Sequence, residues 1–109
     1  MNELILKIKK IAADNEAGFT IRIPNCEFVK SGYVVAMLET QNSFGEEGLL
    51  KVVEKANETT HIMGGWNEEG LFYWDAVYVI PDRETAIRIG KENQQIAIFH
   101  IETAELIYL

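Results

Sequence analysis

The sequence predicts an α+β protein: a two-layer sandwich with a ferredoxin-like βαββαβ core. Apolar residues recur at helical spacing in three segments, and they alternate or run continuously in the segments between. From residue 33 the predicted order is strand, helix, strand, strand, helix, strand. Two such split units form one sheet with both helices on the same face. A helix and a strand precede this core, and a short strand follows it.

The length of 109 residues fits a single domain, 1–109, because two independent cores would each be too small. The hydrophobic fraction of 48% is that of a globular protein. Lysines interrupt the first apolar segment, and no apolar run is long enough to span a bilayer, so neither a signal peptide nor a membrane helix is expected. Cys26 has no second cysteine to pair with. These features predict a cytoplasmic protein.

The N-terminal segment 3–16 is predicted to form an amphipathic helix that stops before Gly18. Its apolar stripe consists of Leu4, Ile5, Ile8, Ile11 and Ala12. Residues 19–23 alternate between apolar and polar and predict a half-buried strand. Residues 26–32 are expected to be a turn or an irregular link.

Residues 33–40 are β-branched and mostly apolar, which predicts a central strand covered on both faces. A second helix should follow, with Ser43 and Glu46 at capping-box spacing. Its apolar stripe consists of Leu49, Val52, Val53 and Ala56. The helix is expected to end within 57–60.

The segments 61–66 and 71–80 predict a hairpin with its turn at 67–70 and with Gly64-Gly65 as a bulge or strand end. Asp82 is the expected N-cap of a third helix. The narrow apolar face of that helix consists of Ala86, Ile87, Ile89 and Gly90. A strand at 95–101, a turn at 102–105 and a last strand at 106–109, at a sheet edge, complete the prediction.

Three stretches carry a resemblance: GYVVAMLETQNSFGEEGL (32–49), MGGW (63–66) and FYWDAVYVIPDRETAIRIGKENQQIAIFHI (72–101). The chain resembles a family of small uncharacterised proteins of bacterial mobile elements. Such proteins share a Gly-Tyr-Val start, a Thr-Gln-Asn-x-Phe-Gly segment and a helix followed by Gln-x-Ala-Ile-Phe. The resemblance covers most of the chain beyond residue 18. It implies a bacterial cytoplasm and a phage or conjugative context, and it carries over no catalytic residue.

The net charge of −7 argues against direct binding to a nucleic-acid backbone, which requires clustered Lys and Arg. The acidity is concentrated: residues 57–82 contain five acids and no Lys or Arg. Such a surface is suited to docking a basic protein.

These observations predict a non-enzymatic protein-interaction module, acting through an open sheet face and the acidic hairpin. The expected partner-binding residues are Trp66, Glu68, Glu69, Tyr73 and Trp74. Dimerisation through the same aromatic face is an alternative, because unpaired aromatic sheet faces are usually covered.

Two other functions stay open. A small enzyme or small-ligand binder would use Asp75 and His100 in a pocket between sheet and helices. An anti-defence protein of a mobile element would block a nuclease or a DNA-binding surface. A nucleophilic set of Cys26, a histidine and Asp75 lacks any signature around the cysteine. No metal-ligand spacing is present, and no cofactor is predicted.

Overall fold

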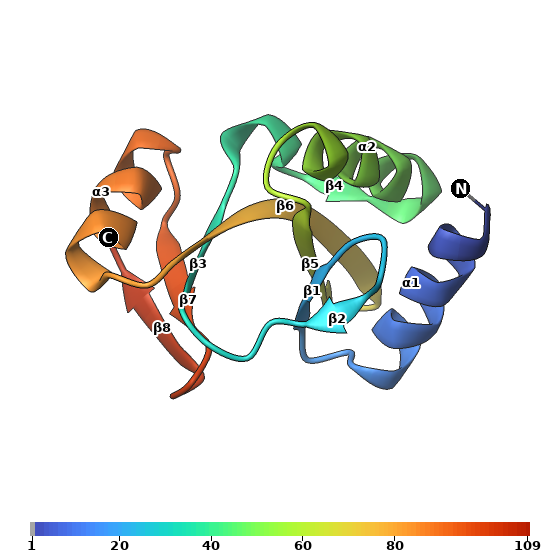
Figure 1. The fold of residues 1–109 in the computed structure, drawn as a ribbon, viewed down its shortest axis with the longest axis horizontal. Coiled ribbons are helices and arrows are strands. Elements are labelled where there is room, and N and C mark those ends of the chain that lie inside the picture. The colour runs from blue at the N-terminus through green and yellow to red at the C-terminus, as the bar shows by residue number, and fades with distance from the viewer. Residues whose placement is uncertain (1) are drawn as a thin grey trace.

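The computed structural model describes residues 2–109; Met1, the first residue of the predicted domain, lies outside them. Figure 1 shows the chain. The elements are α1 (Asn2–Asp14), β1 (Phe19–Arg22), β2 (Glu27–Phe28), β3 (Tyr33–Ala36), the 3₁₀ turn η1 (Leu38–Thr40), β4 (Ser43–Phe44), α2 (Gly45–Glu58), β5 (Ile62–Glu68), β6 (Leu71–Ile80), α3 (Arg83–Glu92), β7 (Ala97–His100) and β8 (Glu105–Tyr108). The protein is therefore a mixed α+β globule.

Within residues 2–109 the strands form one eight-stranded sheet in the order β2-β1-β5-β6-β3-β7-β8, with β4 paired to β6. All the pairings are antiparallel. The long strand β6 connects the two halves of the sheet. Its residues 71–76 pair with β5, and its residues 77–80 pair with β3. Because β5 occupies one edge of β6, β4 pairs with the other edge, in line with β3.

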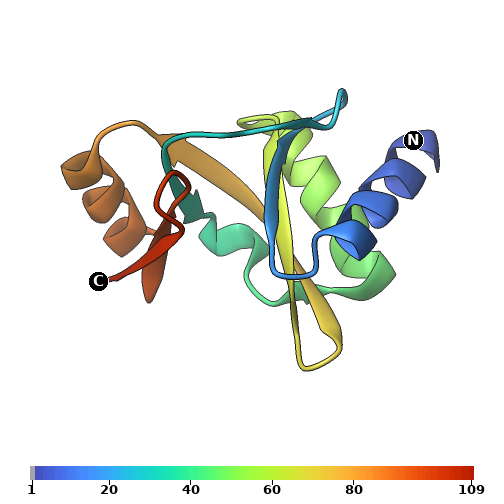
Figure 2. The ribbon, with the colours of Figure 1, turned by 90° about the horizontal axis from the view of Figure 1, so that it is seen from below.

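The helices pack on one face of the sheet and form two core clusters. Trp74 and Ala76 of β6 lie in a cluster with α1 and α2, whereas Ile80 packs on a second cluster with α3. Tyr78 contacts both clusters. Even-numbered positions of β6 share one face, so both clusters lie on the same side of the sheet. Figure 2 shows α1 and α2 at one end of the molecule and α3 at the other.

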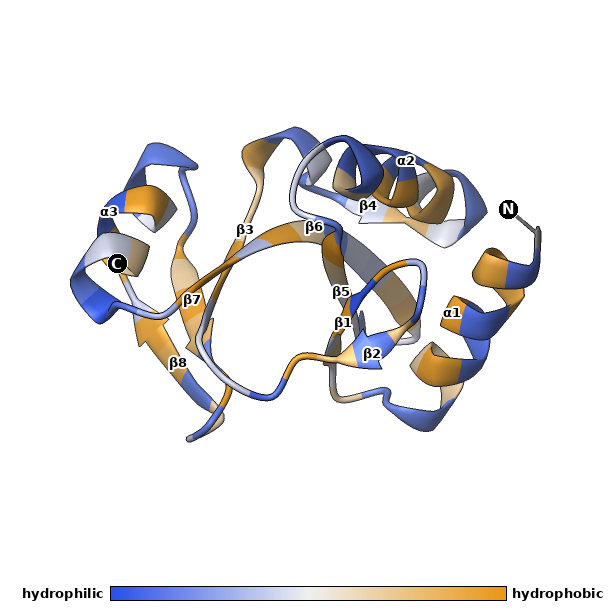
Figure 3. Cartoon of the chain, in the orientation of Figure 1, coloured by the Kyte–Doolittle hydropathy of each residue, from blue (hydrophilic) through white to orange (hydrophobic). Residues whose placement is uncertain are grey.

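The predicted helical stripes are buried as expected. Leu49, Val52 and Val53 of α2 are completely buried, and each such side chain contributes about 1.5–3 kcal/mol on burial. Hydrophobic and hydrophilic residues alternate along α1 and α2 in Figure 3, as expected of helices that bury one side. At the start of α3 the Asp82 carboxylate accepts a hydrogen bond from the Thr85 N–H at 2.8 Å, which confirms the predicted N-cap.

The predicted strand 33–40 is too long. β3 takes the predicted central place between β6 and β7, but it ends at Ala36 and η1 follows. The reason is Thr40, whose buried hydroxyl accepts the Ala76 N–H at 3.1 Å and takes the place of a strand partner. The expected cover on both faces is also wrong, because Val34 on the helix-free face is only partly buried.

The capping box predicted at Ser43 and Glu46 is wrong. Ser43 lies in β4 opposite Trp74, and the N-cap of α2 is Phe44, whose side chain makes no capping bond. Strand pairing holds Ser43 in an extended conformation, so its hydroxyl does not reach the helix N-terminus. That hydroxyl is buried without a hydrogen-bond partner.

The hairpin is confirmed, but the glycine pair is not a bulge or a strand end. Gly64 pairs with Asp75 and Gly65 with Trp74 inside the continuous strand β5. A Cβ at Gly64 would lie 2.5 Å from the Phe19 carbonyl oxygen, so close approach of β1 requires glycine there. The turn is tighter than predicted: only residues 69–70 connect the strands, both with positive φ, as in a type I′ turn.

The ends of α1 and the link after β1 differ slightly from the prediction. α1 ends at Asp14, where Asn15 donates a side-chain hydrogen bond to the Ile11 carbonyl at 2.9 Å. The predicted link 26–32 contains the short strand β2. The last strand lies at the sheet edge, as expected. None of the helices in the described part of the chain is long and apolar enough to cross a membrane.

Candidate functional site

Three aromatic side chains stand side by side on the helix-free face of the sheet. Tyr73 of β6 pairs with Trp66 of β5 on one side and with Phe44 of β4 on the other. The Trp66 and Tyr73 rings are stacked with centroids 5.5 Å apart, and Phe44 meets Tyr73 edge-on at 5.8 Å. Phe44 is 49% exposed and Trp66 is 40% exposed. We call Phe44, Trp66 and Tyr73 the aromatic patch.

The hairpin register places these rings together. The two-residue turn pairs Glu68 with Leu71, and this register carries through to Trp66 and Tyr73. β4 is held against β6 from the other face, where the Trp74 indole N–H donates to the Gly45 carbonyl at 3.1 Å. The patch therefore sits on paired strands rather than on a loop.

Acidic side chains flank the aromatic patch. Glu68 is two residues from Trp66 in β5 and shares its face, and Glu69 is exposed in the turn. Asp75 is two residues from Tyr73 in β6 and lies opposite Gly64. The predicted binding residues Trp66, Tyr73, Glu68 and Glu69 therefore lie together on the hairpin, with Asp75, which was predicted to lie in a pocket with His100, on the face of Tyr73.

Asp75 is the unusual group of this surface. Burial raises the pKa of its carboxyl group from 3.8 to about 6, and a hydrogen bond from the Trp66 side chain opposes part of that rise. The ion pairs within residues 2–109 are Lys9–Glu46, Lys55–Glu39, Arg88–Glu92 and His100–Glu102. Asp75 is in none of them, so no cation of the described chain offsets the cost of charging it.

Trp74 is not part of this surface, and its prediction as a binding residue is wrong. It is only 5% exposed and packs in the core with α1 and α2. Neighbouring residues of a strand point to opposite faces, so Trp74 and Tyr73 cannot both face a partner. Its ring packs against those of Phe72 and Phe19, with centroid distances of 4.6 Å and 6.4 Å.

Asp75 and His100 do not share a pocket. His100 lies opposite Tyr33, which lies opposite Ile80. Asp75 is five residues further along β6, which at about 3.3 Å per residue is a displacement of ~17 Å along the strand, with two strand spacings across the sheet in addition. The structure therefore contradicts the predicted catalytic or ligand-binding pair.

His100 is held by its neighbours. Its ring stacks on Tyr33 with centroids 4.3 Å apart, and Nδ1 lies 2.8 Å from the Thr103 hydroxyl oxygen. Nε2 lies 3.1 Å from Glu102, whose carboxylate also accepts the Gly32 N–H at 2.8 Å. Hydrogen bonding from Gly32 lowers the Glu102 pKa. The shallow recess of about 250 Å³ beside His100 is bordered by this network, which ties the chain before β3 to the β7–β8 turn.

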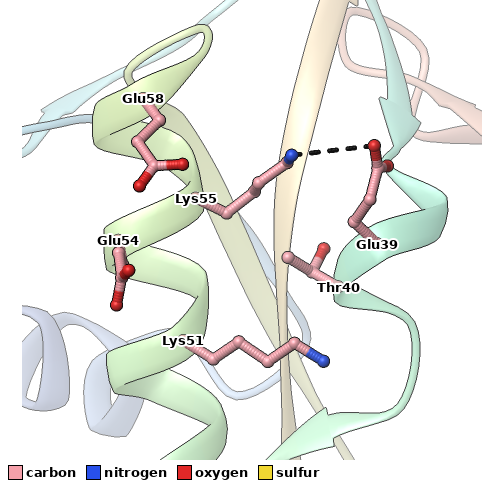
Figure 4. Close-up of a pocket in the computed structure, with 6 residues that line it drawn as sticks. All are labelled: Glu39, Thr40, Lys51, Glu54, Lys55 and Glu58. Atoms are coloured by element: carbon pink, nitrogen blue, oxygen red, sulfur yellow. Dashed lines mark ion pairs between the residues drawn. The ribbon is translucent and has the colours of Figure 1, made fainter.

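A second recess, of about 260 Å³, lies between α2 and η1 (Figure 4). Lys51 and Lys55 extend from α2 toward η1, and Lys55 pairs with Glu39 at 3.6 Å. Glu54 and Glu58 of the same helix also line this recess. Cations and anions are therefore mixed along this recess.

The remaining reactive groups do not form a site. Cys26 is buried, and burial raises the pKa of its thiol, which disfavours the nucleophilic thiolate. In residues 2–109 no group of three or more His, Cys, Asp or Glu side chains is placed to hold a metal ion.

Sequence reasoning missed Phe44, the third ring of the aromatic patch. The pattern around it indicated a helix start, and only its pairing with Tyr73 shows that it faces away from the helices.

Comparison of the chain with protein-family models, curated proteins and solved structures found no match. The mobile-element resemblance and the cytoplasmic location stay predictions.

Proposed function

We propose that the protein is a non-enzymatic interaction module that binds a Lys- or Arg-bearing segment of another protein. The binding surface is the aromatic patch together with Asp75, Glu68 and Glu69. The observation that carries the proposal is the half-buried Asp75, which lies beside the exposed Trp66 ring and forms no ion pair with any cation of residues 2–109.

The aromatic patch supplies the apolar part of the surface. Large exposed aromatic side chains on a rigid sheet lose little conformational entropy on binding and are typical anchors of protein interfaces. A guanidinium or ammonium group over such a ring gains about 0.5–1 kcal/mol at an exposed site and more when water is excluded. Trp66, the ring type that binds cations most strongly, shares a strand face with Glu68, and its side chain lowers the pKa of Asp75.

Asp75 supplies the specificity. Charging this carboxyl group in the free protein costs more than charging an exposed one, because burial has raised its pKa to about 6. A cation placed against it favours the charged form and offsets that cost. A neutral or acidic segment leaves the cost in place, so the surface discriminates in favour of basic partners.

The same charges argue against nucleic acid as the ligand. Bases stack on aromatic side chains, but strand binding normally adds a positively charged groove for the phosphates. Here the groups beside the rings are Glu68, Glu69 and Asp75. Phosphates would meet negative charge at the site where their bases stack.

The test is a titration of the ¹⁵N-labelled protein with a synthetic peptide of alternating Gly, Arg and Lys. The proposal predicts shifts confined to the Trp66 indole N–H and the backbone of Tyr73 and Asp75, weakening as salt is added. The same peptide with Glu in place of Arg and Lys, and a single-stranded oligothymidine, should produce none.

Two variants make the test specific. Trp66→Leu should abolish the shifts at Asp75. Phe28→Leu, which removes a ring of similar exposure from β2, should leave them unchanged. Two results would overturn the proposal. One is a set of peptide-induced shifts that spreads beyond the aromatic patch and its acids and does not depend on Trp66. The other is binding of the oligothymidine at this face.

We also propose that β3, α2, β5, β6, α3 and β7 form a ferredoxin-like core. The supporting observation is the strand order β5-β6-β3-β7, with neighbours antiparallel and α2 and α3 in the two crossovers. That is the order expected of two interleaved split units.

An anti-defence role would be one case of the proposed binding, with a basic surface of a host nuclease as partner. It stays a prediction.

A further inference from the structure

The outer edge of β8 is the second unusual surface. β8 ends the sheet order, and its residues Glu105–Tyr108 contain no Lys or Pro, the residues that commonly protect a free edge from pairing. Leu106 is 55% exposed and Tyr108 is 73% exposed. Both face the helix-free side, because Ile107 between them packs in the second core.

The hydrogen-bonding pattern between β7 and β8 shows which backbone groups of β8 have no partner in the sheet. The Leu109 N–H donates to the Ile96 carbonyl at 2.9 Å, which makes this a hydrogen-bonded pair. Bonded and non-bonded pairs alternate in an antiparallel ladder, so Ile107 also bonds to Ile98 in β7. Leu106 and Tyr108 therefore direct their N–H and C=O groups outward, to the open edge.

This edge is complementary to itself. When two copies of β8 run antiparallel about a twofold axis at Ile107, Leu106 lies opposite Tyr108 of the second copy. The outward N–H and C=O groups of both residues then form hydrogen-bonded pairs. The exposed Leu106 and Tyr108 side chains contact each other across the junction, an apolar–aromatic pair of the kind that stabilises sheets. The two Glu105 carboxylates lie at opposite ends of the paired strands.

We propose that β8 is a homodimer interface, through which two copies join their sheets edge to edge. The occupant is a second copy because an arbitrary strand would meet the open backbone groups but would lack the matched Leu106–Tyr108 contacts. The junction is short, so the buried area falls below the ~1,200 Å² of a stable interface and the dimer is weak and concentration-dependent. This surface is distinct from the aromatic patch, which remains free in the dimer.

The experiment combines sedimentation equilibrium with amide hydrogen exchange over a range of protein concentrations. The proposal predicts a mass that rises toward that of a dimer, and protection of the Leu106 and Tyr108 amides that rises with it. The Ile107 amide, which already bonds to β7, should be protected at every concentration. Exchange rates of the Leu106 and Tyr108 amides that do not change with protein concentration would overturn the proposal.

Three variants locate the interface. Tyr108→Pro removes an outward N–H that the monomer does not use, so it should keep the sheet and abolish the dimer. Leu106→Lys keeps the backbone and should also give a monomer, which guards against misfolding of the proline variant. Leu6→Lys, an exposed change on α1, should dimerise like the parent. A dimer that survives Leu106→Lys, or that Trp66→Leu dissociates, would contradict an interface at β8.

Discussion

The side chain of Asp75 lies beside that of Trp66 on the helix-free face of the sheet, where the indole lowers the pKa of the carboxyl group and burial raises it. This contact joins the one strongly perturbed acid of the hairpin to its most exposed tryptophan. Burial still outweighs the hydrogen bond, so the free protein carries a carboxyl group that is costly to ionise at neutral pH.

Replacing Asp75 with Asn should stabilise the protein at neutral pH. The folded carboxyl group has a pKa of about 6, above its value of 3.8 in the absence of burial. The folded state thus holds the proton more tightly, and stability falls as pH rises from about 4 to about 6. Asp75→Asn should remove this loss and raise the free energy of unfolding by roughly 2–3 kcal/mol at pH 7.5. Urea unfolding at pH 4 and pH 7.5 measures it.

At pH 4 the Asn variant and the parent should unfold at similar urea concentrations, because the parent carboxyl group is then largely protonated. Trp66→Phe provides the complementary change: loss of the indole donor should raise the Asp75 pKa further. A pH-independent effect of Asp75→Asn would contradict the assignment of the carboxyl group to this environment.

The hydroxyl of Thr40 should be essential to the turn between β3 and β4. It accepts the Ala76 N–H at 3.1 Å in a completely buried position. Thr40→Val leaves that N–H without an acceptor, and we expect a loss of about 1–3 kcal/mol in unfolding free energy. Thr40→Ser keeps the hydroxyl and should lose less. A smaller loss for Val than for Ser would show that the methyl group, and not the hydrogen bond, matters.

Gly64 should tolerate no side chain. A Cβ there would lie 2.5 Å from the Phe19 carbonyl oxygen, a backbone atom that can move only if β1 shifts from β5. Gly64→Ala should therefore cost about 1–3 kcal/mol or more in unfolding free energy. Glu68→Ala in the same strand is the exposed control and should stay within about 0.5 kcal/mol of the parent. Differential scanning calorimetry distinguishes the two.

The Glu102 carboxylate should protect the Gly32 amide from exchange. It accepts that N–H at 2.8 Å and lies 3.1 Å from His100. Because the pKa of Glu102 is lowered, the carboxylate form that makes this contact is lost only as pH falls through that lowered value. Glu102→Ala should accelerate hydrogen exchange at Gly32 at pH 7, whereas Glu105→Ala should not. Unchanged exchange would show that another group protects this amide.

The sequence was sufficient for the three helices and for the hairpin that carries the site, but not for β2, η1 and β4. Helical spacing located the buried stripe of α2, and Asp82 marked the start of α3 through its own side chain. These signals are local, since each depends on residues within a few positions. The strand alternation likewise placed Trp66 and Tyr73 on strands that pair.

Features set by distant contacts were not predictable in the same way. Ser43 and Glu46 have capping spacing, but pairing with Trp74 forces Ser43 into a strand. Gly64 and Gly65 were ambiguous until their close neighbours in β1 and β6 were known. Both faces of β6 carry large apolar residues, so alternation separates Tyr73 from Trp74 without indicating which one the helices cover.

The most direct test of the proposed function is a measurement of the Asp75 pKa. It uses ¹³C NMR of the carboxyl carbon, with and without the Arg- and Lys-containing peptide. The free protein should titrate near 6. Bound peptide should lower this pKa toward the ordinary value of about 4, because a cation beside the carboxylate favours its charged form. A peptide that binds while the Asp75 pKa stays near 6 would contradict recognition of a basic segment at this site.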